Sequence, residues 1–448
     1  MDSTQFGLVS SIFTLGGLTG ALVAGPLSAR YGRYLTMLGT TVFFTLGGTL
    51  EALSTNLATM IVGRLISGLG AGAAVVVVPI YISEVAPPKE KGFFGAFTQI
   101  MTNVGIFITQ LLGLFLSKGQ LWRIILAVGG AFGVALAIGL VLGGQESPKW
   151  LADNGRPSQA KRVLQKLRGH GADINEEVKG WGLESSQDLE EEEQSLLDNE
   201  DHISSDNPEG PTPAHGPGNK AKQAAKTTAR ELLGPFAVLA HPDSRAAVLA
   251  VSVIMVGQQL CGINSIVMYG VGLLSDLLAA NSAVLNVAVA ALNIVVTTSC
   301  APLTDKLGRK TCLLLSTAGM GISSLLLGIG INQHIKVLSA VSVLTFVSSF
   351  GLGLGPIPFI LSSELVGSEA VGATQSWALA ANWIATFLVA QFFPMVNDRL
   401  GKGIVYFFFA AMAVVFGSFT AWFVPETKGK ANADEVWGRK KSGSEREG

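Results

Sequence analysis

Long apolar stretches separated by short polar turns dominate the chain. A helix needs about 20 mostly apolar residues to cross the hydrocarbon core of a bilayer. Stretches of this kind with few charges fall near residues 7–28, 35–55, 59–82, 93–117, 121–143, 246–270, 282–303, 311–331, 336–361, 373–397 and 403–424. The eleven stretches predict an all-α, multi-pass membrane protein.

The composition agrees with this class, because 49% of the 448 residues are hydrophobic and 14% are charged. Cys261, Cys300 and Cys312 lie in or beside predicted spans without the spacing of a metal or redox motif. We interpret them as small apolar residues. We expect no metal, no cofactor and no nucleic-acid partner, and the bilayer is the predicted environment.

Clusters of lysine and arginine indicate the orientation. They lie at 30–33, 89–91 and 306–310, in the segment 144–245 and from 428 onward, all on one side of the predicted spans. That side is the cytoplasm by the positive-inside rule. The loops on the other side are poorer in cations, although Arg399 and Lys402 lie there.

These positions divide the chain into four parts. We expect an N-terminal bundle at 1–145, a cytoplasmic linker at 146–245, a C-terminal bundle at 246–425 and a cytoplasmic tail at 426–448. Inside the linker, an acidic and then Pro/Gly-rich stretch at about 180–235 is predicted to be disordered. Its sequence EEQSLL, from Glu192 to Leu197, has the acidic-dileucine form that sorting adaptors bind, and a solvated charge run is the alternative.

An internal repeat relates the two bundles. GPLSARYGR at 25–33 matches APLTDKLGR at 301–309, 276 residues later, and the SE pair at 83–84 matches 363–364, 280 residues later. Subtracting the same offset from 258–264 places the first-half counterpart of QQLCGIN before residue 1. The repeat therefore predicts two pseudo-symmetric six-helix bundles with helix 1 missing, as in a fragment or a truncated inactive product.

Nine short motifs then occur in a fixed order. They are RYGR (30–33), GRLISGLGAG (63–72), PIYISEVAPPKEKG (79–92), QESPKW (145–150), QQLCGIN (258–264), DKLGRK (305–310), GPIPF (355–359), NW (382–383) and PETKG (425–429). Together they give a chain that resembles the sugar porter family of the major facilitator superfamily, in particular facilitative glucose/hexose transporters of fungal type. The resemblance implies a sugar substrate and no enzymatic reaction.

The QQLCGIN stretch places amides inside an apolar span. On a straight helix Gln259 and Asn264 would point about 140° apart, and Gln258 and Asn264 about 120° apart. A break at Gly262 is therefore needed to direct all three into one cavity. Amides both donate and accept hydrogen bonds, as sugar hydroxyls do, and the resemblance implies that these three contact a hexose.

Further substrate residues follow from the resemblance, position by position. Helix-packing polar or aromatic residues are the alternative interpretation for each of them. The family's glutamate and tryptophan beside the GPIP turn are Gly351 and Phe359 here, which leaves the identity of the sugar open. The additional candidates are Gln99, Asn293, Phe359, Asn382 and Trp383.

Charged residues beside the spans are assigned by the resemblance to a gate at the cytoplasmic end, closed by ion pairs when the cavity opens outward. Simple positive-inside topology explains the cations but not the carboxylates among them. Val371 stands where the family has arginine, so we expect the weaker gate in the second half. The gating candidates are Arg30, Arg33, Arg64, Glu84, Lys91, Glu146, Tyr269, Lys306, Arg309, Glu364 and Glu426.

The predicted mechanism is alternating access to a site between the two bundles. The chain has no Walker A sequence for ATP. We favour facilitative uniport over proton symport, because the predicted spans hold almost no acid. A sugar sensor that does not transport is the alternative function, and the membrane is vacuolar, endosomal or the plasma membrane.

Overall fold

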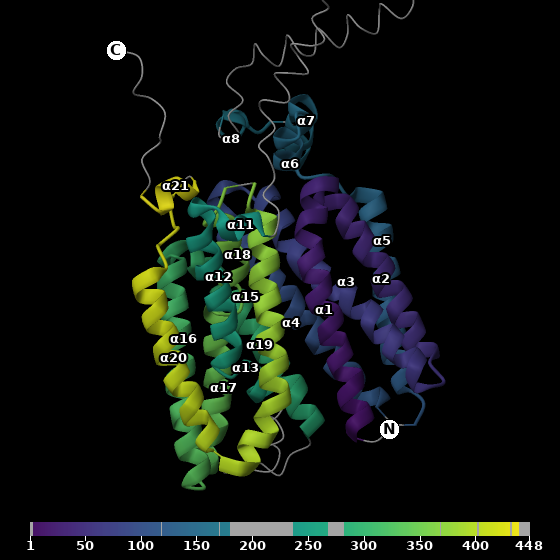
Figure 1. Ribbon diagram of the computed structural model, residues 1–448, viewed down its shortest axis with the longest axis vertical. Helices are drawn as coiled ribbons and strands as arrows, with labels where there is room; N and C mark the ends of the chain where they lie inside the picture. Colours follow the sequence, from purple (N-terminus) through teal and green to yellow (C-terminus); the bar gives the residue numbers. More distant parts are fainter. Residues whose placement is uncertain are drawn as a thin grey trace, which may run out of the picture.

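The computed structural model describes residues 3–117, 119–169, 171–179, 236–267, 282–367, 369–400, 403–430 and 432–438. Within these ranges the chain forms helices and no strand. The helices of the first half and those of the second half stand side by side, with their long axes roughly parallel (Figure 1). The all-α class predicted from the sequence is confirmed.

Five long helices build the first half, and three short ones follow them. The cap of α3 is Asn56, whose side chain accepts from the Thr59 N–H, and α6 begins with Pro148 after the Ser147 cap. The elements are α1 (Ser3–Tyr31), α2 (Arg33–Leu53), α3 (Leu57–Val85), the 3-10 turn η1 (Pro88–Glu90), α4 (Lys91–Leu116), α5 (Trp122–Gly143), α6 (Pro148–Asp153), α7 (Pro157–Arg168) and α8 (Asn175–Lys179).

Two interruptions shape the second half. Gly262 has φ +101° and separates α12 from α13, and residues 353–356 separate α17 from α18. The elements are α11 (Ala237–Ala240), α12 (Pro242–Leu260), α13 (Ile263–Ser265), α15 (Ser282–Leu307), α16 (Arg309–Asn332), α17 (Lys336–Leu352), α18 (Ile357–Glu364), α19 (Val371–Leu400), α20 (Ile404–Phe423) and α21 (Ala433–Val436).

Helix packing repeats between the halves. In the first half α3 packs on α1 and α2, and α5 packs on α2. In the second half α17 packs on α15 and α16, and α20 packs on α16. The interface between the halves repeats too, since α1 packs on α19 and α15 packs on α4. Helix α12 packs on α19 and α20 and has no counterpart among the described helices of the first half.

Ten of the described helices or helix pairs are long and apolar enough to cross a membrane. The remaining predicted span, 35–55, is α2, whose 21 residues include five threonines. At about 1.5 Å per residue it also matches the thickness of the hydrocarbon core. Large apolar side chains face outward, such as Leu142 at 82% and Trp422 at 90% exposure. The chain is an integral, multi-pass membrane protein.

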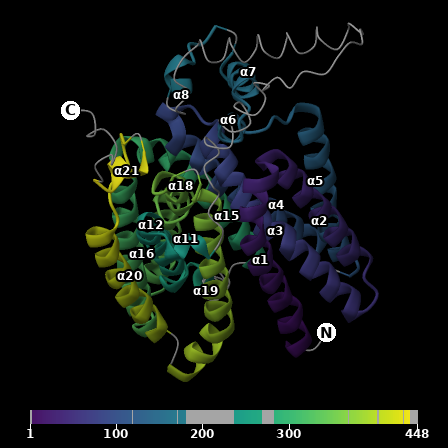
Figure 2. The same cartoon turned by 45° about the horizontal axis from the view of Figure 1, so that its top comes forward.

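The short helices α6, α7 and α8 cover one end of the bundle (Figure 2). The Trp150 indole N–H donates to the Ala29 carbonyl at 2.8 Å, and Arg168 donates to the Val85 carbonyl at 2.8 Å. These bonds attach the linker to the ends of α1 and α3. This end carries the cationic loops and is the cytoplasmic end by the positive-inside rule.

Candidate substrate site and gate

Four amide side chains meet beside the break in α12. Asn264 donates to Gln259 Oε1 at 2.6 Å, and Gln259 donates to Asn382 Oδ1 at 3.3 Å. Asn382 donates to Gln258 Oε1 at 2.8 Å, and Gln258 donates to the Leu354 carbonyl at 2.6 Å. We call Gln258, Gln259, Asn264 and Asn382 the α12 amide cluster. The break expected at Gly262 is present, and it brings the Asn264 side chain within hydrogen-bonding distance of Gln259.

A second polar cluster joins α4 to α15 across the interface between the halves. Gln99 donates to Asn103 Oδ1 at 3.0 Å, and Asn103 donates to Thr297 Oγ1 at 3.0 Å. Asn293 donates to Asn103 Oδ1 at 3.3 Å and accepts from Thr297 at 3.2 Å. We call these four residues the α4–α15 polar cluster. Asn103 is 1% exposed and lies at its centre.

The break between α17 and α18 lies between the two clusters. Leu354 in this break accepts the bond from Gln258, while a Cβ added to Gly355 would lie 3.2 Å from Gln99 Cγ. A Cβ added to Gly351, at the end of α17, would lie 2.8 Å from Thr297 Oγ1. Both clusters thus border the same interrupted helix, where free backbone groups and amides are available to a polar ligand.

The gate of the first half is built around Arg33. Its guanidinium donates two 2.8 Å bonds to the Glu84 carboxylate and one 3.0 Å bond to the Ser28 carbonyl. Glu146 caps the start of α2 by accepting from the backbone N–H groups of Arg33 at 2.9 Å and Tyr34 at 3.2 Å. A carboxylate at a helix N-terminus is favoured by the helix dipole. These contacts bind the ends of α2, α3 and the α5–α6 loop together.

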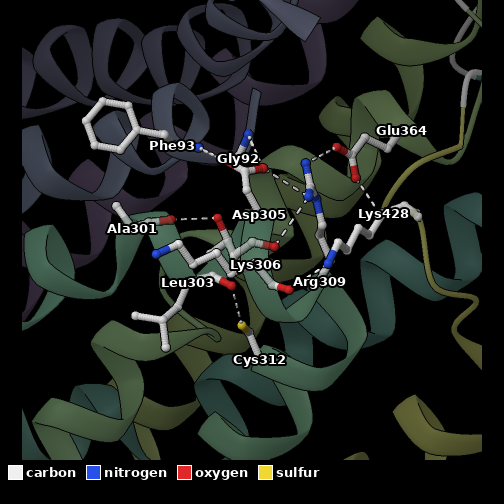
Figure 3. Close-up of polar contacts among 12 residues, drawn as sticks. Gly92, Phe93, Ala301, Leu303, Asp305, Lys306, Arg309, Cys312, Glu364 and Lys428 are labelled. Carbon is white, nitrogen blue, oxygen red and sulfur yellow. Dashed lines mark hydrogen bonds and ion pairs between the residues drawn. The ribbon is translucent and has the colours of Figure 1, made fainter. Parts of the chain in front are cut away.

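The gate of the second half repeats this arrangement around Arg309. It pairs with Glu364 at 2.9 Å and also with Asp305 at 3.1 Å. Glu426 caps α16 by accepting from the Arg309 N–H at 2.8 Å. The Thr427 hydroxyl donates to Glu364. Figure 3 shows Arg309 between the carboxylates of Asp305 and Glu364.

Asp305 also ties the two halves together. Its carboxylate accepts from the backbone N–H groups of Gly92 at 3.1 Å and Phe93 at 2.9 Å, at the start of α4 (Figure 3). The matching residue of the first half is Ala29, 276 positions earlier. The first half therefore has no carboxylate at the corresponding position, and the second half supplies the cap. The contact joins α15 to the start of α4 at the end of the bundle that carries the cationic loops.

The family model for the sugar (and other) transporters matches residues 2–204 and 216–436. The chain belongs to the sugar transporter family. The transporter is 32% identical over 438 residues to a probable metabolite transport protein, YBR241C, of Saccharomyces cerevisiae, covering 98% of this chain and 83% of that protein. It is 31% identical to the vacuolar protein sorting-associated protein 73 of the same yeast, covering 96% and 82%.

Two further comparisons concern a plant relative and a solved structure of the same fold. The probable plastidic glucose transporter 1 of Arabidopsis thaliana is 31% identical over 441 residues, covering 96% of this chain and 75% of that protein. Among solved structures, the proton:xylose symporter XylE bound to 6-bromo-6-deoxy-D-glucose superposes with a TM-score of 0.75 at 22% identity, covering 98% and 91%. The transporter therefore has the major facilitator fold.

Other predicted residues of the transporter lie apart from these clusters. Phe359 and Lys91 line a small cavity beside the gates, and no amide of either cluster lines it. Arg30 is exposed and lies over the Tyr31 ring at 5.3 Å. Lys306 is exposed, and its carbonyl accepts from Lys428 at 2.6 Å. Tyr269 is outside the described residues, as is the EEQSLL stretch.

Trp383 belongs to an aromatic contact between the halves. Its ring meets Phe13 of α1 edge-to-face, with the ring centroids 6.1 Å apart. A Cβ added to Gly17 of the same helix would lie 2.7 Å from the indole. Its neighbour Asn382 lies in the α12 amide cluster, so α19 presents one residue to the cluster and the next to the other half.

Arg64 does not lie at the cytoplasmic gate, and that assignment is corrected. It is 20 positions before Glu84 on the same helix α3, a distance of about 30 Å along the axis. It lies at the opposite end, where its Nε is 3.4 Å from the Glu51 carboxylate and its guanidinium is 6.0 Å from the Phe13 ring.

Three residues of the sites escaped the sequence analysis. Asn103 follows Gln99 by four positions, and this spacing places both on one face of a helix. Asp305 opens the DKLGRK motif, and only the fold shows that it reaches α4. Glu51 was a detectable signal, because a carboxylate inside an otherwise apolar span indicates a functional site.

Proposed function

We propose that this sugar transporter carries a hexose or a related monosaccharide by alternating access. The observation that carries the proposal is the meeting of two hydrogen-bonded amide clusters at the interrupted α17–α18 helix, between the halves. Amides that bond to one another can exchange those bonds for bonds to sugar hydroxyls at low cost. The substrate residues are Gln99, Gln258, Gln259, Asn264, Asn293, Asn382 and, as an addition, Asn103.

The gates supply the alternation. Arg33 with Glu84 and Arg309 with Glu364 hold each half together, and Asp305 holds the halves to one another at the cytoplasmic end. Opening toward the cytoplasm breaks the Asp305 bonds to α4 and separates the two halves while each stays rigid. Movement of the sugar requires no covalent chemistry, so the proposed activity is transport and not an enzymatic reaction.

The driving force is the finer part of the proposal. The preference for uniport rested on the near absence of acid from the spans, but Glu51 is a buried carboxylate within α2. Facilitative uniport stays the proposal, and Glu51, the one acid of α2, is the residue it has to account for.

Domain boundaries and location complete the proposal. We keep the division into bundles at 1–145 and 246–425, a linker at 146–245 and a tail from 426. A vacuolar or endosomal membrane is favoured over the plasma membrane by the dileucine sequence and by the similarity to a vacuolar protein sorting-associated protein.

The test is uptake of radiolabelled D-glucose and D-xylose by liposomes that contain the full chain. Asn293→Ala should abolish saturable uptake, because it removes one amide of the α4–α15 polar cluster. Asn154→Ala is the matched control, since Asn154 is exposed and its side chain, among the described residues, bonds to the nearby Trp150 carbonyl and lies outside both clusters. Sugar binding without flux in the parent protein would support a sugar sensor and contradict the proposed transport. Equal uptake by both variants would remove the polar cluster from the site.

A further inference from the structure

An apolar groove runs along the outside of the first half, between α1 and α2. Its volume is about 310 Å³, which falls within the range of about 300–1,000 Å³ found for pockets that hold small ligands. Leu69 and Ala73 of α3 form its floor. Val23 on one wall and Leu35 on the other are each 53% exposed, so the groove opens toward the lipid.

The groove has about the length of one bilayer leaflet. On α1 it runs from Thr19 to Tyr31, a distance of about 18 Å at 1.5 Å per residue. Half of the hydrocarbon core measures about 15 Å. Tyr31 is the last residue of α1 and lies at the end that carries the cationic loops. The groove therefore reaches from the cytoplasmic surface to about the middle of the membrane.

Polar groups are available at the cytoplasmic end of the groove. Deeper in, the lining is apolar, and the hydroxyls of Thr19 and Thr40 donate to backbone carbonyls of their own helices at 2.9 Å and 2.7 Å. At the cytoplasmic end, Tyr31 is 50% exposed, and the Arg30 guanidinium lies 5.3 Å from the centre of its ring. A phenol donates and accepts hydrogen bonds, and a guanidinium donates them. The groove thus matches a molecule with a long apolar body and one small polar end.

Gly39 leaves open space in the α2 wall. A Cβ added there would meet no atom within 4 Å, although a glycine inside a helix costs about 1 kcal/mol relative to alanine. By the 276-residue offset Gly39 corresponds to Leu315, which is 49% exposed, and Tyr31 corresponds to Leu307. The second half therefore has leucines at both positions, so the packing of this fold requires neither the open space nor the phenol.

The sequence at this end of the groove also has a pattern that has been proposed for sterol contact. Leu27, Tyr31 and Arg33 have the order and spacing of the pattern [LV]-x1–5-Y-x1–5-[KR]. Leu27 and Tyr31 line the groove, whereas Arg33 is paired with Glu84, and Arg30 is the exposed cation. Such a short pattern does not identify a site by itself, so the shape and chemistry of the groove carry the inference.

We propose that this groove binds a sterol of the cytoplasmic leaflet. The sterol hydroxyl lies at Tyr31 and Arg30, the fused rings lie along Gly39, and the tail points toward the middle of the membrane. A rigid ring system loses less conformational entropy on binding than an acyl chain with many rotatable bonds. The bound sterol contacts α1, α2 and α3 together, beside the turn that carries Arg33. The site is separate from both amide clusters, so the inference does not depend on which substrate is carried.

Photolabelling of the full chain in phospholipid vesicles tests the site, with photoactivatable cholesterol as the probe. Labelling should be saturable, should map to peptides of α1 and α2, and should be displaced by cholesterol more strongly than by its 3α-hydroxy epimer. Gly39→Leu should reduce it by about tenfold, because the new side chain fills the groove. Gly139→Leu, also in open space but on α5, is the matched control and should label like the parent. Tyr31→Leu, which removes the phenol, should reduce labelling by a smaller factor.

A thermal measurement provides a second readout. Cholesterol in the vesicles should raise the unfolding midpoint of the parent and of Gly139→Leu, and should leave that of Gly39→Leu unchanged. The midpoint without cholesterol shows whether Gly39→Leu is folded, and Tyr31→Leu takes its place if it is not. The proposal is overturned if both groove variants label like the parent or if the labelled peptides come from other helices. Equal labelling of these peptides by a photoactivatable phosphatidylcholine would identify a general acyl-chain groove and would also overturn it.

Discussion

The two halves of the transporter carry the same candidate gate in different electrostatic surroundings. Arg33 and Arg309 each pair with a glutamate and each begin a helix capped by a second carboxylate. Around them the halves differ in sequence. Ala29 is the repeat counterpart of Asp305, and Leu327 and Leu344 are the repeat counterparts of Glu51 and Arg64. The repeat thus preserves what holds each half together, whereas Asp305 and the Glu51–Arg64 pair occur in one copy.

The expectation that the second half has the weaker gate is not what the contacts show. It rested on Val371 replacing an arginine, but Arg309 pairs with two carboxylates and Arg33 with one. Lys91, the first-half counterpart of Val371, forms no ion pair within the described residues and lines a cavity instead. The contacts that strengthen the second gate come from Asp305 and Thr427.

The largest effect is expected from removing the gate arginines. Arg33→Ala should destabilise the protein by about 3–5 kcal/mol, because Glu84, with a side chain 6% exposed, loses its charge partner. Arg309→Ala should cost less, since Glu364 and Asp305 are 16% and 24% exposed and keep other donors. Thermal unfolding in detergent measures both, and equal losses would contradict the difference between the halves.

A smaller and symmetric effect is expected at the two helix starts. Gly32 and Gly308 have φ +96° and +94° with ψ near 160°, a region that is almost restricted to glycine. Gly32→Ala and Gly308→Ala should each cost about 1–3 kcal/mol, because the new methyl group also meets Glu146 or Glu426. Gly129→Ala, in open space on α5, is the control. A loss of stability in one variant alone would show that the two helix starts are not equivalent.

Removing the cap between the halves should shift a conformational balance. Asp305→Asn should weaken the contact with α4 by about 0.3–1 kcal/mol and favour opening to the cytoplasm. The measurement is the rate at which a Ser363→Cys reporter in the gate cavity reacts with a water-soluble maleimide, compared with the same background without the reporter. Ala29→Asp is the companion variant, since it supplies the absent carboxylate. An unchanged rate in Asp305→Asn would show that the cap does not hold the gate.

The smallest effect is expected at Gly351, where the family resemblance predicts a side chain. Gly351→Ala places a methyl group 2.8 Å from Thr297 Oγ1 and 3.2 Å from Asn293 Oδ1, so the polar cluster must shift slightly. The preference between D-glucose and D-xylose in competition uptake should change by less than tenfold, or about 1.4 kcal/mol. No change in preference would place Gly351 outside the selectivity site.

Much of the fold follows from residue order, and much of the site does not. Apolar stretches and the repeated GPLSARYGR motif are local, so they predicted the spans and the relation between the halves. The helix break at Gly262 was predictable, because Gln258, Gln259 and Asn264 cannot all point into one cavity from a straight helix. Asp305 depends on which helix ends meet in space, which spacing along the chain does not give, so its contact with α4 required the packed structure. The place of Arg64 did not, because 20 residues on one span already separate it from Glu84.

In the proposed alternating-access cycle, the Asp305 cap should make opening sensitive to the salt of the cytosol. While the cap is formed, its carboxylate and the α4 N–H groups are bonded to each other and partly shielded from dissolved ions. Once the halves part, the same groups face an electrolyte whose screening length is about 8 Å at physiological ionic strength. Ions stabilise the separated charges more than the joined ones, so a rise in cytosolic ionic strength should lengthen the time that the proposed carrier spends open to the cytosol.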